Sequence, residues 1–317
     1  MNDHQQRPSL LSSLGKAACY FILFFGWQVI VMSVYLAVQM AVAMETGGDI
    51  WTAYDLLFEK SFELGAISNL LTLFSVVVIM KVRRKSLRQE LWLRPVSGKL
   101  LGWCAAFSFC LYWLVTLVLA VLPESVMAGY DEAAMGLADT GFVVVVSTAL
   151  ISPVVEEVIF RGLIYTRLER SMRPATAAAV SALVFAFCHG QAVWVCYAYA
   201  LGLLFALVTR HSRSILPALL MHVVFNTTNE VLVLLGDWEP GIVGGILICL
   251  VGVGGSAFCA RRVWALAMEQ EKKVEEAVPA EPVREYQAEV PAAPARPAPA
   301  AWDTDSGIHH RFPPERM

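Results

Sequence analysis

Eight stretches of the sequence are long, apolar and free of Lys, Arg, Asp and Glu, and they limit the possible folds more than any other feature. A helix that crosses a bilayer needs about 20 such residues. The first stretch is too long for a signal-peptide core and lacks a convincing cleavage site, so we expect it to be a retained span. The stretches are residues 17–44, 64–80, 100–123, 141–155 with its continuation, 174–188, 190–209, 214–229 and 240–260.

The composition agrees with this interpretation. Hydrophobic residues make up 57% of the chain and charged residues only 16%, which is too apolar for an ordinary soluble domain of this length. We therefore expect an all-α fold, a polytopic membrane helix bundle of about eight transmembrane helices in a lipid bilayer. The formal net charge is −3, and without a basic aromatic surface the sequence gives no indication of nucleic-acid binding.

The cations predict which loops face the cytoplasm, because cytoplasmic loops are enriched in Lys and Arg. Cations cluster before the first stretch and after the second, fourth, sixth and eighth, whereas the intervening loops are acidic and hold only Lys60 as a cation. Both termini should therefore be cytoplasmic. The clustered cations are Arg7, Lys16, Lys81, Arg83, Arg84, Lys85, Arg88, Arg94, Lys99, Arg167, Arg170, Arg173, Arg210, Arg213, Arg261 and Arg262.

Three ionisable residues interrupt the fourth stretch, where the sequence reads SPVVEEVIFRG. A charge at the middle of a membrane helix costs roughly 2.5 to 3.5 kcal/mol, and such residues are usually paired, inward-facing and functional. Glu157 and Arg161 are four residues apart, so they can share a helix face and neutralise each other. Glu156 points about 100° away from Glu157 and lacks that partner.

Further polar residues in later stretches can lie at the depth of Glu156. If the chain turns near residues 172–174, Glu156 and His189 each lie about 16 residues, or about 24 Å, from that turn. His222 and Asn226 share a helix face about 15 to 21 Å from the cytoplasmic end of their span. A lone membrane histidine is more often structural, but together these residues predict an intramembrane polar cavity.

This set of groups suits peptide hydrolysis without a covalent intermediate. A carboxylate in a low-dielectric site is a better base, and a neighbouring imidazole helps it to hold and deprotonate a water molecule. A second histidine and an asparagine on one helix face can donate hydrogen bonds to the oxyanion that forms at an attacked amide carbonyl.

Three short motifs resemble those of a known family. EEVIFRG resembles an EExxxR motif, FAFCH an FxxxH motif and HVVFN an HxxxN motif of the CPBP family of CAAX proteases and bacteriocin-processing enzymes, which includes type II CAAX prenyl endopeptidases. The resemblance covers roughly residues 140–235. It implies an all-helical membrane bundle with a conical cavity, Glu156 as the water-activating residue with His189 as its partner, and His222 with Asn226 as the oxyanion-binding pair. It also implies that Glu157 and Arg161 orient the site.

The organisation that follows has five parts. Residues 1–16 form a cytoplasmic segment, 17–139 the N-terminal transmembrane helices and loops, and 140–235 the CPBP-like catalytic helices. Residues 236–268 form a final transmembrane helix. The Pro-, Ala- and Glu-rich residues 269–317 cannot bury a core and should be a disordered cytoplasmic tail.

The participation of a metal is open at this stage. Glu156, His189 and His222 could supply a zinc site with three ligands and one open position, and members of the resembled family are commonly labelled metalloproteases. The sequence contains no HExxH motif. We favour water activation without a metal.

Two other classes of function compete with the protease. Intramembrane Glu, Arg and His also build proton relays in transporters, but these ionisable residues are confined to the fourth to seventh stretches without a matching set in the first three. A noncatalytic membrane regulatory partner is the other alternative. For the protease we expect a membrane-embedded or membrane-attached peptide substrate, not prenylated, in a bacterial plasma membrane.

Overall fold

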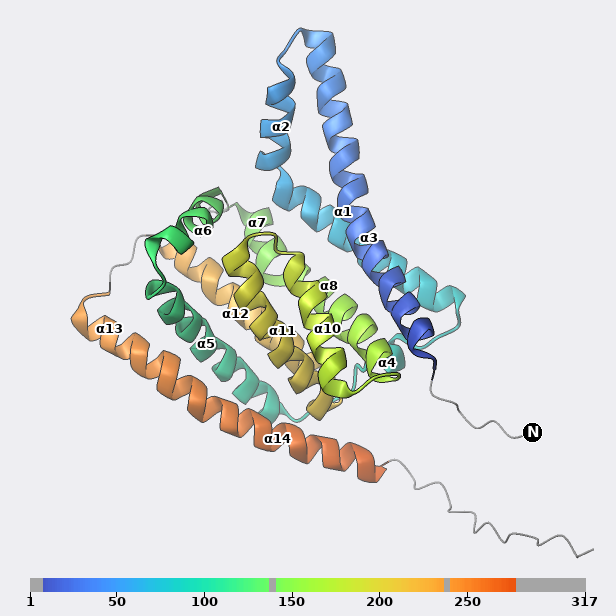
Figure 1. The fold of residues 1–317 in the computed structure, drawn as a ribbon, viewed down its shortest axis with the longest axis vertical. Helices are drawn as coiled ribbons and strands as arrows, with labels where there is room; N and C mark the ends of the chain where they lie inside the picture. The colour runs from blue at the N-terminus through green and yellow to red at the C-terminus, as the bar shows by residue number, and fades with distance from the viewer. Residues whose placement is uncertain (1–7, 137–140, 237–239, 278–317) are drawn as a thin grey trace, which may run out of the picture. The chain divides into compact units, whose positions relative to one another are not determined.

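The computed structural model describes residues 8–136, 141–236 and 240–277, and it describes the side chains of all of these except residues 131–136. The described residues form helices and no strand (Figure 1). The bundle is therefore all-α, as predicted. The elements are α1 Leu10–Thr46, α2 Ile50–Glu59, α3 Ser61–Val82, α4 Leu87–Glu90, α5 Gly98–Ala120, α6 Glu124–Gly136, α7 Phe142–Val146, η1 Ser147–Ile151, α8 Ser152–Glu156, η2 Glu157–Tyr165, α9 Thr166–Glu169, α10 Pro174–Phe187, α11 Ala192–Ser212, α12 Leu216–Leu235, α13 Ile242–Cys249, η3 Leu250–Gly255 and α14 Ser256–Ala277.

Among the described residues, seven helices are long and apolar enough to cross a membrane. Large apolar side chains such as Phe25, Phe74 and Leu247 are exposed on them, as expected where lipid replaces water. The protein is an integral membrane protein. The seven helices are Leu10–Thr46, Ser61–Val82, Gly98–Ala120, Phe142–Glu169, Ala192–Ser212, Leu216–Leu235 and Ile242–Ala277.

The fifth predicted stretch, residues 174–188, is shorter than a full crossing. It forms α10, an apolar helix of 14 residues, which at 1.5 Å per residue is about 21 Å long, against a hydrocarbon core of about 30 Å. The apolar run continues to Cys188, but the chain turns after Phe187 and puts His189 in that turn. The count of eight therefore becomes seven long helices and one short one.

The helix from Phe142 to Glu169 lies at the centre of the bundle, where it packs against α1, α3, α10, α11 and α12. It contains two wide π-helical segments, η1 and η2. Pro153 has no N–H and its ring crowds the preceding turn, and in η1 the Ser152 N–H bonds to the Ser147 carbonyl, five residues back. Such π segments often accompany functional sites.

Buried apolar side chains on both sides of this central helix hold it in place. One cluster joins η2 to α1, α3 and α10 and includes Phe160 and Phe185, whose rings pack edge to face at 5.2 Å. The other joins α5, α11, α12 and α14 around Phe205 and Met221. The two clusters fix the positions of α10, α11 and α12 relative to η2, and so of the polar residues they carry.

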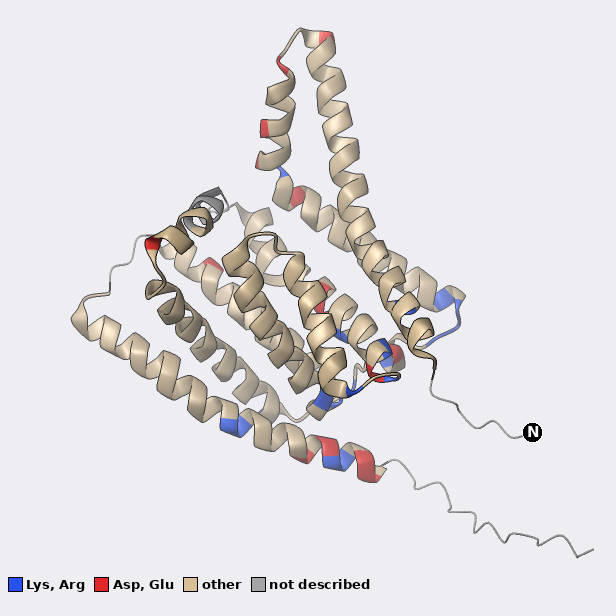
Figure 2. Cartoon of the chain, in the orientation of Figure 1, with Lys and Arg blue, Asp and Glu red and all other residues tan. Residues whose placement is uncertain are grey.

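Lys and Arg residues gather at one end of the helices (Figure 2). There Arg167 of α9 pairs with Glu90 of α4, and Arg210 of α11 pairs with Glu169 of α9 at 2.6 Å. The last helix reaches the same end and continues to Ala277, beyond the boundary predicted at residue 268. Its extension is helical because it has partners, among them Glu271, which lies 2.6 Å from His211.

Candidate active site

The four residues predicted to carry the chemistry line one cavity of about 470 Å³ inside the spans. Glu156 is the last residue of α8, His189 follows α10, and His222 and Asn226 lie one turn apart on α12. Residues of α3, α5, α6, α11 and η1 also line it. The cavity is therefore built where the central helix meets the helices on both of its sides.

Glu156 and His222 approach each other across this cavity. Glu156 Oε2 lies 3.6 Å from His222 Nε2, and the side chains are 19% and 7% exposed. The separation is longer than a direct hydrogen bond, so a small shift of either side chain, or a water molecule, can connect them. The Glu156 carboxylate is thus accessible from the cavity.

Glu157 faces away from the cavity into a fully buried cluster. Its Oε1 atom lies 2.9 Å from Arg161 Nη1 and 2.9 Å from His222 Nδ1. The ion pair with Arg161 is present as the spacing predicted. The bond to His222 was missed, because spacing along one helix says nothing about the residue that an adjacent helix presents. Glu157 therefore holds His222 through Nδ1, while Nε2 of the same ring faces Glu156 at 3.6 Å.

Arg161 is completely buried, and aromatic rings take the place of most of its hydrogen-bond partners. Its Cζ atom lies 4.3 Å from the centre of the Phe185 ring and 5.4 Å from that of Phe205, where the ring faces attract a cation. Within the described residues its Nε and Nη2 atoms have no hydrogen-bond partner. Gly202 leaves room for the guanidinium, since a Cβ atom there would lie 3.2 Å from Nη2.

His189 and Asn226 are each oriented by a backbone carbonyl. His189 Nδ1 lies 3.1 Å from the Phe185 carbonyl, so Nδ1 donates and a neutral ring leaves Nε2 as an acceptor. Asn226 Nδ2 donates to the Thr148 carbonyl at 2.9 Å. An amide nitrogen has two hydrogens, so Asn226 keeps one for another acceptor.

Several supporting residues were not predicted. Phe185 is the first residue of FAFCH, so the motif contained it, but only the fold shows that it packs against His189 at 4.8 Å and against Arg161. The Thr148 carbonyl, Phe205 and Gly202 carry no sequence signal, because their contacts depend on how the helices cross. Glu230, which also lines the cavity, has the plain signal of a carboxylate within a span.

The described residues do not form the ligand set that a zinc site would need. Among them, no three His, Cys, Asp or Glu side chains come together in a group that could hold a metal ion. One nitrogen of His222 is bonded to Glu157 and one of His189 to a carbonyl.

A comparison with protein families agrees with the three motifs. Residues 138–228 match the model of a family described as type II CAAX prenyl endopeptidase Rce1-like. The match covers less than a third of the chain. It includes the central helix, α10, α11 and the part of α12 that carries His222 and Asn226. No curated protein and no solved structure matches the chain.

Proposed function

We propose that this protein is an intramembrane endopeptidase that hydrolyses a peptide bond in a membrane-embedded or membrane-attached peptide or protein. The observation that carries the proposal is the shared cavity: a carboxylate, two imidazoles and a carboxamide line one space of about 470 Å³ among membrane helices. The similarity of residues 138–228 to the type II CAAX prenyl endopeptidase Rce1-like family supports the same class of reaction.

In the proposed reaction Glu156 is the base. A water molecule between Glu156 and the scissile carbonyl loses a proton to Glu156 as it attacks. His189 accepts a hydrogen bond from the same water through Nε2, because its Nδ1 atom is bonded to the Phe185 carbonyl. Glu156 then returns the proton to the leaving amine, so that the carboxylate is regenerated without a covalent intermediate.

His222 and Asn226 stabilise the oxyanion. Since Glu157 is paired with Arg161 and accepts from Nδ1 of His222, Nε2 carries a hydrogen only when the ring holds both protons. In that form Nε2–H donates to the oxyanion, together with the second amide hydrogen of Asn226. Fixed donors in a low-dielectric site are worth more than donors in water.

The proposed reaction needs no metal, and Glu156 with the two imidazoles is sufficient for it. Glu156, His189 and His222 do not form a group that could hold a metal ion among the described residues, so a zinc ion that supplied an activated water would require these side chains to move. We place the protein in a bacterial plasma membrane with both termini cytoplasmic, following the side on which Lys and Arg gather. Its substrate would not be prenylated.

The test compares wild-type protein, Glu156→Gln and Glu124→Gln in detergent with a library of quenched peptides, each with and without a strong chelator. Glu124 is an exposed acidic residue at the start of α6 and serves as the matched control. We expect cleavage by wild type and Glu124→Gln, unaffected by chelation, and none by Glu156→Gln. Cleavage that persists in Glu156→Gln would show that Glu156 is not the base. Loss of wild-type cleavage on addition of the chelator would show that the reaction requires a metal.

A further inference from the structure

The cavity contains a carboxylate that the proposed reaction does not use. Glu230 lines it together with Glu156 and Asn226 and lies four residues after Asn226 on α12. Its side chain forms no ion pair and no hydrogen bond with the described residues. A charge within a span is costly when it is unpaired, so this carboxylate is suited to a partner that arrives from outside the chain.

Aromatic side chains line the same cavity as that carboxylate. Tyr112 lines the cavity and packs edge to face on Phe225 at 5.4 Å, and Tyr130 packs on Trp194 at 5.8 Å. A carboxylate beside aromatic faces binds an ammonium or guanidinium group, because the ring faces attract the cation that the carboxylate neutralises. Neither an acidic nor a purely aliphatic side chain gains both contributions.

We propose that Glu230 and these rings form a subsite for a Lys or Arg side chain of the substrate, which rests on the proposed function. Along α12, Glu230 lies about 6 Å beyond Asn226 and about 12 Å beyond His222. An extended peptide advances about 3.3 Å per residue. The cationic residue is therefore two to four residues from the scissile bond, on the side that lies toward Leu235 at the end of α12.

The test uses three otherwise identical peptides with Lys, Gln or Glu at those positions, cleaved by wild type, Glu230→Gln, Glu230→Lys and the control Glu124→Gln. Wild type and Glu124→Gln should prefer the Lys peptide to the Glu peptide in kcat/KM. Glu230→Gln should lower that preference about tenfold or more, and Glu230→Lys should reverse it. The Gln peptide should be cleaved equally by all four. An unchanged preference in both Glu230 variants would overturn the subsite.

Binding separates the subsite from the chemistry. In a Glu156→Gln background the dissociation constants of the same peptides report recognition without turnover. Weaker binding of the Lys peptide after Glu230→Gln supports the subsite even if Glu156 is not the base, and equal binding overturns it. Failure of wild type to cleave any peptide would overturn the proposed function, whichever way the binding result falls.

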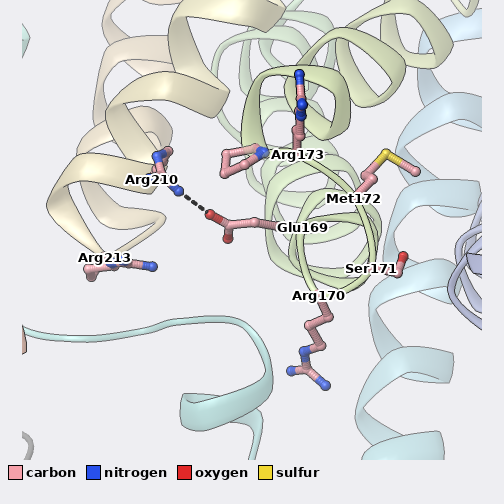
Figure 3. A pocket seen from close by; sticks show the side chains of 8 residues that line it. Glu169, Arg170, Ser171, Met172, Arg173, Arg210 and Arg213 are labelled. Carbon is pink, nitrogen blue, oxygen red and sulfur yellow. Dashed lines mark hydrogen bonds and ion pairs between the residues drawn. The ribbon is translucent and has the colours of Figure 1, made fainter. Parts of the chain in front are cut away.

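A second cavity, of about 710 Å³, carries an independent inference (Figure 3). It lies where α9 ends, α10 begins and α11 ends, among the gathered Lys and Arg residues (Figure 2). Arg170, Arg173, Arg210 and Arg213 line it, with Glu169 as the only acidic residue of the wall. Arg173 precedes α10, whose first turn has no side-chain cap, so backbone N–H groups there are also free to bind an anion.

The cations that line this cavity outnumber the carboxylates that line it. Arg210 is paired with Glu169 at 2.6 Å, but Arg173 forms no ion pair with any described residue. The described wall of the cavity holds four arginines and one glutamate. Carboxylates outside the wall pair with Arg170 and Arg213, namely Glu90 at 3.6 Å, Glu271 at 3.3 Å and Glu275 at 3.4 Å, and they leave Arg173 available for an anion.

We infer that this cavity binds the phosphate of an anionic lipid headgroup. Arginine forks suit phosphate oxygens, and basic pockets between membrane helices on the cytoplasmic side recognise such headgroups. Met172 and Pro174 in the wall add apolar surface suited to the glycerol and upper acyl region. A bound headgroup would connect α9, α10 and α11. α9 continues directly from η2, which carries Arg161, His189 follows α10, and α11 carries Gly202.

The test measures the melting temperature in phosphatidylcholine nanodiscs with and without phosphatidylglycerol. The control is Lys81→Gln/Arg83→Gln, which alters two exposed cations outside the cavity. The anionic lipid should raise the melting temperature of wild type and of this control by about 5 °C. Arg170→Gln/Arg173→Gln should lose most of that gain. Equal gains in both double variants would overturn the site. A gain of the same size from inorganic phosphate in detergent would overturn the assignment to lipid.

Discussion

The Nδ1 atom of His222 lies 2.9 Å from the Oε1 atom of Glu157. The same oxygen lies 2.9 Å from Arg161 Nη1, and both Glu157 and Arg161 are completely buried. A single carboxylate oxygen therefore neutralises a buried cation and fixes the ring that faces Glu156. Glu157 takes no part in the proposed proton transfers. It nevertheless fixes a hydrogen on Nδ1 of His222, and so determines when Nε2 can also donate one.

Removing either member of the Glu157–Arg161 pair should be worse for stability than removing both. Glu157→Leu leaves the Arg161 charge buried without a counter-ion, which costs about 3–5 kcal/mol, whereas replacing a whole buried pair by apolar residues is often neutral. Glu157→Leu/Arg161→Met should therefore melt above Glu157→Leu alone. The measurement compares the melting temperatures of wild type, Glu157→Leu, Arg161→Met and the double variant in one detergent.

Activity should not recover with stability in that double variant. His222 loses the carboxylate that fixes its ring, so the kcat of the double variant should stay about 10²-fold or more below that of wild type. A double variant that is both stable and fully active would show that the bond between Glu157 and His222 has no part in positioning. A double variant that melts no higher than Glu157→Leu would contradict the account of the pair.

Asn226→Ala should lower kcat by about 10²–10³-fold and change KM little, because an oxyanion donor acts only in the transition state. Thr227→Ala, at an exposed neighbouring position on the same helix, is the control and should change neither constant. Steady-state kinetics with one quenched peptide give both values. A rise in KM at constant kcat would assign Asn226 to substrate binding instead.

Gly202→Val should disturb the site without touching a reacting group. Its Cβ atom would lie 3.0 Å from the Ala182 Cβ atom and 3.2 Å from Arg161 Nη2, and overpacking of this kind costs about 1–3 kcal/mol. The displaced guanidinium should also lower kcat. Gly26→Val in α1, where a Cβ atom meets nothing within 4 Å, is the matched control. Equal melting temperatures for the two variants would contradict this packing.

Much of this arrangement was accessible from the sequence because it depends on local rules. Uncharged runs marked the spans, and the four-residue spacing gave the ion pair between Glu157 and Arg161. Counting residues from the turns gave the common depth of Glu156 and His189, which line one cavity. The roles of these residues in catalysis remain predictions.

The other features of the site could not be predicted from the sequence, because they depend on how several helices pack together and on local departures from regular helix geometry. The central helix widens into η2 from Glu157 onward, so regular α-helical arithmetic cannot fix which side chain faces which neighbour. The contacts of Phe185 and Phe205 with Arg161 follow from the crossing of three helices. The short α10 ends at Phe187, and the turn that follows contains Cys188 and His189, although the apolar run continues to Cys188.

Glu90 should make the stability of the protein depend on pH. Burial alone raises the pKa of Glu90, but the hydrogen bond from Lys85 and the charges of Arg167, Lys85 and Arg170 outweigh it, so the pKa lies below its ordinary value of 4.5. A lowered pKa means that the folded protein holds the charged form more strongly than the unfolded chain. The stabilisation is therefore complete above about pH 4.5 and is lost as the pH falls through the folded-state pKa.

The comparison that isolates this effect is Glu90→Gln against wild type, with Glu45→Gln at an exposed position as the control. At neutral pH, Glu90→Gln should be less stable by about 1–3 kcal/mol, because it loses charged hydrogen bonds. Below pH 4.5 the difference should shrink, since wild type then loses the same bonds by protonation. Melting curves between pH 7 and pH 3.5 measure both values, and a difference that stays constant with pH would show that Glu90 keeps its proton state on unfolding.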